Sequence, residues 1–190
     1  MASIFITGSA DGLGQLAARR LVALGHDVVM HGRNHDRAQD ATRAVPGART
    51  ALEGDLASIE QTRALAQQAN AAGPFQAVIH NAGIYRPSAG RRETVDGLDD
   101  VFAINAVAPY LLTVLIEGPQ RLPGDLEQGV ATQVWLAISD EHGAKVTGRY
   151  FYHKRTPPAH PAASDVTVQN GFLSACEQLT GVRLASAVTK

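Results

Sequence analysis

Short apolar runs alternate with amphipathic segments along the first 83 residues of the chain. Four runs rich in aliphatic residues predict buried strands, and the segments between them repeat apolar residues every three or four positions, which predicts helices. The predicted strands lie at residues 3–7, 27–32, 49–56 and 75–83, and the predicted helices at 13–25, 35–45 and 58–73. This alternation is typical of a parallel sheet with crossover helices, and it favours an α/β fold.

The pattern changes in the second half of the chain. Residues 98–116 have the length and apolar content of a well-buried helix, in which Pro109 should introduce a kink. The next stretch is rich in proline and glycine, and it leaves no room for a fifth strand before the following helical pattern. After it we expect a helix at 125–143, a strand at 144–155, a loop at 156–164 and a final helix at 165–181.

The composition, with 45% hydrophobic and 18% charged residues, is that of one globular domain over residues 1–190. The formal charge is -1 and no block of like charges occurs, which argues against nucleic-acid and membrane-surface partners and favours small molecules. Cys176 is the single cysteine, so no internal disulfide can form, and neither a signal peptide nor a membrane span is recognisable. We therefore expect a cytoplasmic protein. The seven histidines lack metal-ligand spacing, so we expect no metal site.

The segment T-G-S-A-D-G-L-G, residues 7–14, stands between the first predicted strand and the first predicted helix. Its glycines permit a tight turn and let a pyrophosphate approach the backbone, while the helix N-terminus offers free N–H groups to the negative charge. A merely structural turn is the alternative. The spacing G-x-x-x-G-x-G resembles that of the short-chain dehydrogenase/reductase family. The cofactor-binding residues expected in this segment are Gly8, Ser9, Asp11, Gly12, Leu13 and Gly14.

Three further motifs resemble this family, in the family's order. In G-D-L, Asp55 and Leu56 would flank the adenine. The motif H-N-A-G resembles the family's N-N-A-G signature, with the expected cofactor-binding residues Asn81, Ala82 and Gly83. Asn105 takes the place of the family's structural and catalytic asparagine in the long helix. Each match alone has an ordinary structural explanation, but together they make the resemblance specific over residues 1 to about 120.

The resemblance implies a Rossmann-like, doubly wound parallel sheet that binds a nicotinamide dinucleotide. We expect residues 1–122 to be the dinucleotide-binding half and residues 123–190 a C-terminal helix–strand–helix unit. Enzymes that prefer NAD place an acid after the second strand, whereas this chain has Gly32 followed by Arg33, which suits a 2′-phosphate. We therefore favour NADP over NAD. Asp11 argues against NADP, because it adds negative charge near the phosphates. The alternative for Arg33 is that it is an ordinary surface residue without a role in cofactor choice.

Tyr150 and Lys154 have the family's catalytic spacing Y-x-x-x-K, and Ser139 precedes them. In the mechanism that the resemblance implies, tyrosine exchanges a proton with the substrate oxygen, lysine lowers its pKa, and serine steadies the substrate. That chemistry needs tyrosine and lysine on one helical face, about 6 Å apart. The stretch 144–155 is instead rich in β-formers and is followed by three prolines, which favours a strand. We expect these three residues to be decoys.

The chain also resembles a bacterial subgroup of the family, in which a similar helix and strand follow the catalytic segment. On that alignment the chain passes from Leu122 to Pro123 over a gap of roughly eighty family residues, which would have held strands five and six and the tyrosine–lysine helix. The sheet would then have the order 3-2-1-4, and two arrangements of its edge follow. Either the C-terminal strand lies beside strand four, or the edge of strand four stays open and pairs with another chain. The loss would also uncover the long helix, which predicts a homo-oligomer.

Three functions remain open on this reasoning. The first is an NADP-dependent short-chain oxidoreductase acting on a small carbonyl or alcohol. The second is a non-catalytic nucleotide-binding or association module. The third is a deletion variant without a selected activity. The resemblance supports cofactor binding more strongly than turnover, because the residues that would perform the chemistry lie in the part that the alignment leaves out.

Overall fold

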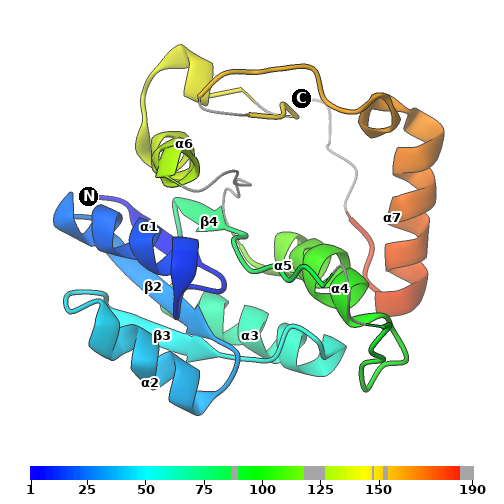
Figure 1. The fold of residues 1–190 in the computed structure, drawn as a ribbon, viewed down its shortest axis with the longest axis horizontal. Coiled ribbons are helices and arrows are strands. Elements are labelled where there is room, and N and C mark those ends of the chain that lie inside the picture. The colour runs from blue at the N-terminus through cyan, green and yellow to red at the C-terminus, as the bar shows by residue number, and fades with distance from the viewer. Residues whose placement is uncertain (87–89, 118–126, 147, 152–153, 185–190) are drawn as a thin grey trace.

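A computed structural model describes residues 1–86, 90–117, 127–146, 148–151 and 154–184 of the chain. Its centre is a four-stranded parallel sheet in the order β3-β2-β1-β4, with a crossover helix between each pair of strands that follow one another in the sequence (Figure 1). The strands are β1 (Ser3–Ile6), β2 (Asp27–Gly32), β3 (Thr50–Glu53) and β4 (Ala77–Ile79). The α/β, Rossmann-like fold and the strand order 3-2-1-4 are therefore confirmed.

The crossover helices begin and end close to the predicted residues. They are α1 (Gly12–Ala23), α2 (His35–Ala44) and α3 (Ile59–Ala72). Asn34 caps α2 because its Oδ1 accepts a hydrogen bond from the Arg37 N–H at 3.0 Å. Ser58 caps α3 in the same way, and its Oγ accepts from the Gln61 N–H at 3.3 Å. Polar caps thus fix where α2 and α3 start, whereas Asp11 at the N-cap of α1 makes no capping hydrogen bond through its side chain.

The two faces of the sheet are covered by different helices, as the two-residue period of a strand requires. Ile4 and Ile6 of β1 point to the face that carries α1, α2 and α6 (Glu127–Ile138). Phe5 points to the opposite face, which carries α3 and α5 (Ala108–Leu115). β1, β2 and β4 contribute fully buried side chains to these layers, whereas the residues of the edge strand β3 are half-buried or exposed, so the core lies on both sides of the central strands.

The predicted long helix is built from three consecutive pieces. A short helix, α4 (Asp100–Phe102), leads into a π-helical turn, Ala103–Val107, and then into α5. Pro109 has no N–H to donate, and the turn just before it departs from the regular i→i−4 pattern. The interruption that Pro109 predicts is therefore present as a π-helical turn.

The strand predicted at residues 144–155 is wrong. Among the described residues of this stretch, Ala144 ends a 3₁₀ turn (His142–Ala144), and 148–151 and 154–155 join no strand and no helix. Gly148 and Lys154 have positive φ angles of 68° and 59°, which interrupt an extended backbone. The predicted helix at 125–143 is also shorter than expected, since α6 ends at Ile138 and its residues before Glu127 lie outside the described part.

One face of β4 is covered by α6. Ala77, Val78 and Ile79 are 0%, 0% and 2% exposed, and Val134 and Ala137 of α6 belong to the same apolar cluster as Ile79. Figure 1 shows α6 passing above β4 and beside α1. In the described part of the chain β4 is the last strand of the sheet, so the C-terminal strand predicted beside it is not present there, and α6 packs on the same face as α1.

The C-terminal helix α7 (Val166–Thr180) has the predicted limits, with Asp165 as N-cap and Gly181 as a left-handed C-cap. It stands at the right of Figure 1, beside the α4–α5 segment. Leu111 of α5 and Cys176 of α7 are fully buried in one cluster, and the Tyr110 hydroxyl donates to the Val182 carbonyl at 2.6 Å. The long helix is thus covered on this side by α7, which contradicts the expectation that it is uncovered. None of the helices that the structure describes is long and apolar enough to cross a membrane.

Candidate dinucleotide site

The glycine-rich loop, residues 7–14, connects β1 to α1 at the carboxyl edge of the sheet. Gly8 and Gly12 have positive φ angles of 60° and 53°, which L-residues with side chains rarely adopt. The first N–H groups of a helix have no partner within the helix, and the first backbone bond here runs from the Gln15 N–H to the Asp11 carbonyl at 3.1 Å. The loop therefore presents donors and a positive dipole end, as anion binding requires.

Two glycines of this loop allow close approach to the segment after β4. A Cβ on Gly14 would lie 2.4 Å from Nδ2 of Asn81, and a Cβ on Gly8 would lie 2.8 Å from the Cα of Ala82. A Cβ on Gly12 would meet no atom within 4 Å. Internal packing therefore leaves no room for a side chain at Gly8 or Gly14, whereas Gly12 borders open space at the start of α1.

The segment Asn81–Ala82–Gly83 is hydrogen-bonded directly to the glycine-rich loop. Asn81 Nδ2 donates to the carbonyls of Thr7 and Gly8, at 3.0 and 2.9 Å. The Ala82 N–H donates to Oγ1 of Thr7 at 3.1 Å. Two motifs more than sixty residues apart in the sequence thus form one structure, as the resemblance implied.

Asn105 lies in the π-helical turn and holds the chain just after Gly83. Its Oδ1 accepts from the Ile84 N–H at 2.9 Å, and its Nδ2 donates to the Ile84 carbonyl at 2.8 Å. π-helical turns often occur at functional sites. In this structure the Asn105 amide fixes the backbone of the loop after β4, which is a structural task.

In the G-D-L segment, Leu56 packs in the core and Asp55 stabilises the turn that leads into α3. Leu56 is buried in the apolar cluster between the sheet and α3. Asp55 Oδ1 accepts from the Ala57 N–H at 2.9 Å, and the Asp55 N–H donates to Oε1 of Gln61 at 3.0 Å. These contacts hold the loop after β3 next to the end of β2.

His31, which the sequence analysis did not single out, joins the loops after β1 and β3. Its Nδ1 accepts from the Gly8 N–H at 2.9 Å, and its Nε2 lies 2.9 Å from the Gly54 carbonyl. Its backbone N–H donates to Oγ of Ser9 at 2.8 Å, and Ser9 Oγ donates to the Ile6 carbonyl at 2.8 Å. A single histidine in a buried strand reads as an ordinary core residue, so no pattern in the sequence pointed to this role.

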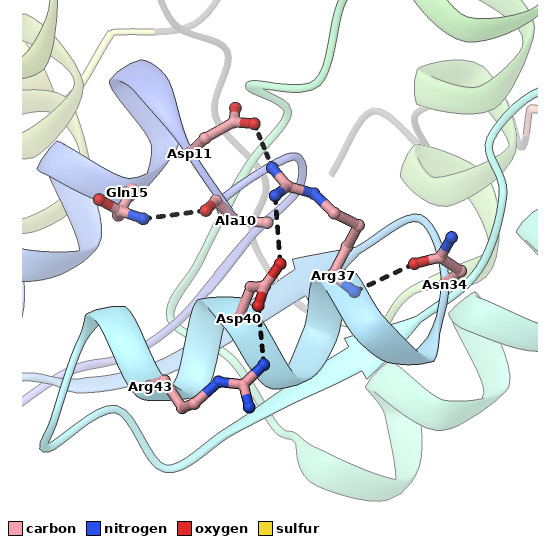
Figure 2. A network of polar contacts seen from close by, with 7 residues as sticks. All are labelled: Ala10, Asp11, Gln15, Asn34, Arg37, Asp40 and Arg43. Atoms are coloured by element: carbon pink, nitrogen blue, oxygen red, sulfur yellow. Dashed lines mark hydrogen bonds and ion pairs between the residues drawn. The ribbon is translucent and has the colours of Figure 1, made fainter.

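Charged side chains form a network beside the loop, shown in Figure 2. Arg37 of α2 contacts the carboxylate of Asp11 in the glycine-rich loop, and its Nη1 lies 3.3 Å from Oδ2 of Asp40. Arg43 donates to Asp40 at 2.8 Å, and this hydrogen bond is the main reason why the pKa of Asp40 is lowered. The sequence analysis missed Arg37. Its pairing with Asp11 offsets the negative charge that counted against a 2′-phosphate.

The end of β2 cannot hold an acidic side chain. A Cβ on Gly32 would lie 2.4 Å from the backbone N of Ala38 and 2.5 Å from the carbonyl carbon of Arg37. Arg33 follows with an exposed side chain that forms no hydrogen bond or ion pair with the described residues. The close packing of α2 on β2 therefore excludes the acid that NAD-preferring enzymes use and leaves a cation next to it.

Ser139, Tyr150 and Lys154 lie after α6. The Ser139 hydroxyl accepts from the Glu141 N–H at 3.1 Å, and the Lys154 N–H donates to Oγ1 of Thr132 at 3.2 Å. Tyr150 is 53% exposed. Within the described part of the chain, no hydrogen bond or ion pair joins these three residues to one another or to Asn105, and Tyr150 and Lys154 do not share a helix.

A parallel sheet whose first crossover opens with a glycine-rich loop, bonded to the segment after β4, defines a nucleotide-binding α/β protein. The family model described as short chain dehydrogenase matches residues 2–117, which is more than half of the 190 residues. The chain belongs to the short-chain dehydrogenase/reductase family.

Two relatives illustrate the relationship, and both are fungal. An uncharacterised oxidoreductase of Emericella nidulans is 54% identical over 121 residues, which are 63% of this chain and 48% of that protein. The short-chain dehydrogenase chry4 of Gibberella zeae is 31% identical over 263 aligned positions, which include 98% of this chain and 100% of that protein. The chain thus spans about half the length of the Emericella protein that it matches.

A solved structure shares the whole fold. The crystal structure of an uncharacterised protein from Mycobacterium paratuberculosis aligns with a TM-score of 0.74 at 21% identity, covering 97% of this chain and 95% of that chain. At this identity the likeness concerns the fold alone.

Family membership implies a nicotinamide dinucleotide cofactor, and the residues present fit one. The space beside Gly12 is open, while the backbone around it is held by Asn81 and His31. A metal is not implied, and no cluster of potential metal ligands occurs among the residues that the structure describes.

Proposed function

We propose that this chain binds NADP(H) at the edge formed by the glycine-rich loop, Arg33 and the segment Asn81–Ala82–Gly83. The observation that carries the proposal is the open space beside Gly12, next to a helix N-terminus and within a loop whose shape is fixed by hydrogen bonds. When bound, such a cofactor supplies hydride transfer. The chain's own residues would hold its pyrophosphate through the backbone N–H groups of residues 12–14.

The choice of NADP over NAD is supported by charge and packing at the end of β2. Arg33 has an exposed guanidinium that pairs with none of the described residues and suits a 2′-phosphate, and the contact of Gly32 with α2 leaves no room for a ribose-binding acid. Fluorescence titration with NADPH and NADH tests the choice. We expect tighter binding of NADPH, and Arg33→Gln should weaken NADPH binding about tenfold or more without changing that of NADH. Equal affinities of the wild-type chain for both cofactors would contradict the assignment.

We propose further that the chain lacks its family's catalytic segment and binds the cofactor without efficient turnover. The alignment with chry4 supports this, because a chain of 190 residues leaves at least 73 of 263 aligned positions unfilled. The non-helical course of Tyr150 and Lys154 supports it as well, since the proton-transfer pair needs one helical face.

An oxidoreductase acting on a small carbonyl or alcohol is the competing function, and turnover distinguishes the two. NADPH is incubated with a panel of carbonyl compounds, and its absorbance is followed over time. We expect enhanced NADPH fluorescence without consumption. Consumption that Tyr150→Phe abolishes, and that the control Tyr152→Phe leaves intact, would establish Tyr150 as a working acid and refute the non-catalytic proposal.

Association with a second copy is supported by an apolar stripe on α7. Val168, Phe172 and Leu179 are exposed and recur at helical spacing, beside the strip of α7 that buries Cys176. We propose a homo-oligomer through this stripe. Light scattering at micromolar concentration should give a mass above 20.1 kDa, and Phe172→Ser with Leu179→Ser should reduce it to the monomer. A monomeric wild-type chain would refute the proposal.

A further inference from the structure

His31 is fully enclosed at the point where three loops of the candidate site meet. It is 2% exposed and lies at the carboxyl end of β2, paired in register with Leu52 of β3. Its ring contacts the backbone of Gly8 on one side and that of Gly54 on the other. The ring is therefore a cross-link between the loop after β1 and the loop after β3.

The two ring contacts require one particular form of the imidazole. The Gly54 carbonyl can only accept, so Nε2 must carry a hydrogen, and the Gly8 N–H can only donate, so Nδ1 must be bare. The imidazolium would place an N–H at Nδ1 against the N–H of Gly8. The observed geometry therefore holds for the neutral Nε2–H tautomer alone.

The backbone of Gly8 cannot move to accommodate a protonated ring at His31. Its φ angle of 60° and its close approach to Ala82 fix its backbone, and its carbonyl accepts from Asn81. The backbone N–H and carbonyl of His31 are bonded to Ser9 as well, at 2.8 and 3.1 Å. The glycine-rich loop is thus held between β2 and the segment after β4, and His31 supplies the contacts on the β2 side.

We propose that His31 is a positioning residue: through its bare Nδ1 it holds Gly8, and so the glycine-rich loop, in the shape that dinucleotide binding requires. This inference rests on the proposed cofactor binding. It predicts that the affinity for NADPH depends on whether the side chain at position 31 offers Gly8 a hydrogen-bond acceptor. If the role of His31 were purely structural, the affinity would depend instead on the packing volume of that side chain or on the number of its hydrogen bonds.

The surroundings of His31 agree with a neutral ring. Burial lowers the pKa of His31 below its usual value, against the smaller opposing effects of the Gly54 hydrogen bond and the Asp55 carboxylate. Among the described residues, Asp55 is the charged group that acts on the ring. Because the unfolded chain binds the proton more readily, the neutral ring contributes stability above the unfolded pKa of 6.5 and loses it as the pH falls below that value.

Two substitutions separate the ring contacts. In His31→Asn, Oδ1 lies two bonds beyond Cβ, as Nδ1 does, and can accept from Gly8. In His31→Gln, Nε2 lies three bonds beyond Cβ, as the histidine Nε2 does, and can donate to Gly54. Each variant keeps one hydrogen bond and loses the other, so the two are matched controls for one another.

The experiment titrates NADPH into the wild-type chain and both variants at pH 7, with amide hydrogen exchange of Gly8 measured by NMR at the same pH. We expect His31→Asn to bind within about threefold of wild type, and His31→Gln to bind about tenfold more weakly with faster Gly8 exchange. Thermal melts identify a variant that fails to fold, and the affinity and Gly8 exchange of the other variant then still test the proposal.

The outcomes separate this inference from the proposed function. If the wild-type chain binds no dinucleotide, the proposed function is refuted, and the role of His31 in binding is refuted with it. If the wild-type chain binds NADPH but His31→Gln binds equally well with unchanged Gly8 exchange, the inference alone is overturned. A folded His31→Asn variant that binds NADPH about tenfold or more weakly than the wild-type chain would also overturn it.

Discussion

Gly12→Ala, compared with Gly25→Ala, tests whether the open space beside the glycine-rich loop is a binding site. Both glycines have positive φ angles, 53° and 79°, and a Cβ on either would meet no atom within 4 Å. The substitutions therefore impose a similar backbone penalty, about 1–2 kcal/mol for an alanine held in the left-handed region. Gly12 opens α1 at the candidate site, whereas Gly25 follows the other end of that helix.

The two variants should differ in cofactor binding. At Gly12 the new methyl group would occupy the space where a pyrophosphate approaches the helix N–H groups. A hydrogen bond to a charged group contributes about 1.5–3 kcal/mol, so the loss of one should weaken binding roughly ten- to hundredfold. Gly25→Ala should leave the affinity unchanged.

Two measurements test this comparison. Urea unfolding, followed by the fluorescence of the single tryptophan, Trp135, gives the free energy of unfolding of each variant. NADPH titration gives the dissociation constant. The reasoning is refuted if Gly12→Ala binds like wild type, or if Gly25→Ala weakens binding as much as Gly12→Ala does.

Three further predictions concern stability. Gly32→Ala should cost about 1–3 kcal/mol in urea unfolding, because its Cβ would lie 2.4 Å from the Ala38 N; an unchanged midpoint would contradict the packing of α2 on β2. Arg49→Met should cost about 1 kcal/mol or less at pH 7, since its pair with Asp27 is partly exposed to solvent. The Arg49 hydrogen bond lowers the pKa of Asp27, so this cost should decrease as the pH falls through 3.8 and below, where the hydrogen bonds of Arg49 to Ala72 and Ser3 remain, and a cost as large at pH 2 as at pH 7 would contradict it. Leu111→Ala should cost about 2–5 kcal/mol and increase proteolysis within α7, and intact α7 in limited digestion would count against its packing on α5.

The sequence predicted the first half of the fold because its signals there are local. The tight turn at Gly8 and Gly12, the Ser58 cap and the two-residue period of the strands depend on neighbours along the chain, and each is present as predicted. The meeting of Asn81 with the glycine-rich loop followed from the resemblance, since the loops after parallel strands lie at one edge of a sheet.

The C-terminal part was mispredicted because strand formation depends on a partner. The stretch with Val146, Tyr150 and Phe151 has the side chains of a strand, but a strand needs a neighbouring strand to complete its hydrogen bonds. Among the described residues no strand lies beyond β4 to pair with this stretch, and α6 covers one face of β4. The local pattern of side chains does not reveal whether such a partner strand is present.

The roles of His31 and Arg37 were missed for a related reason. Their partners, Gly8, Gly54 and Asp11, are 23 or 26 residues away, and the contacts arise only when three loops meet. The exclusion of an acid at Gly32 likewise depends on how closely α2 approaches β2. The sequence suggested the cofactor preference from Arg33, and the structure adds a steric reason why an acid cannot stand before it.

Among the residues that the structure describes, the contacts that shape the candidate site lie within the first 117 residues. They run among the glycine-rich loop, His31, Gly54, Asn81 and Asn105. The described residues after 117 contribute cover instead, since α6 packs on α1 and β4 while α7 packs on α5. The candidate site therefore does not depend on hydrogen bonds to Ser139, Tyr150 or Lys154 in the described part of the chain, so that cofactor binding and turnover can be tested separately.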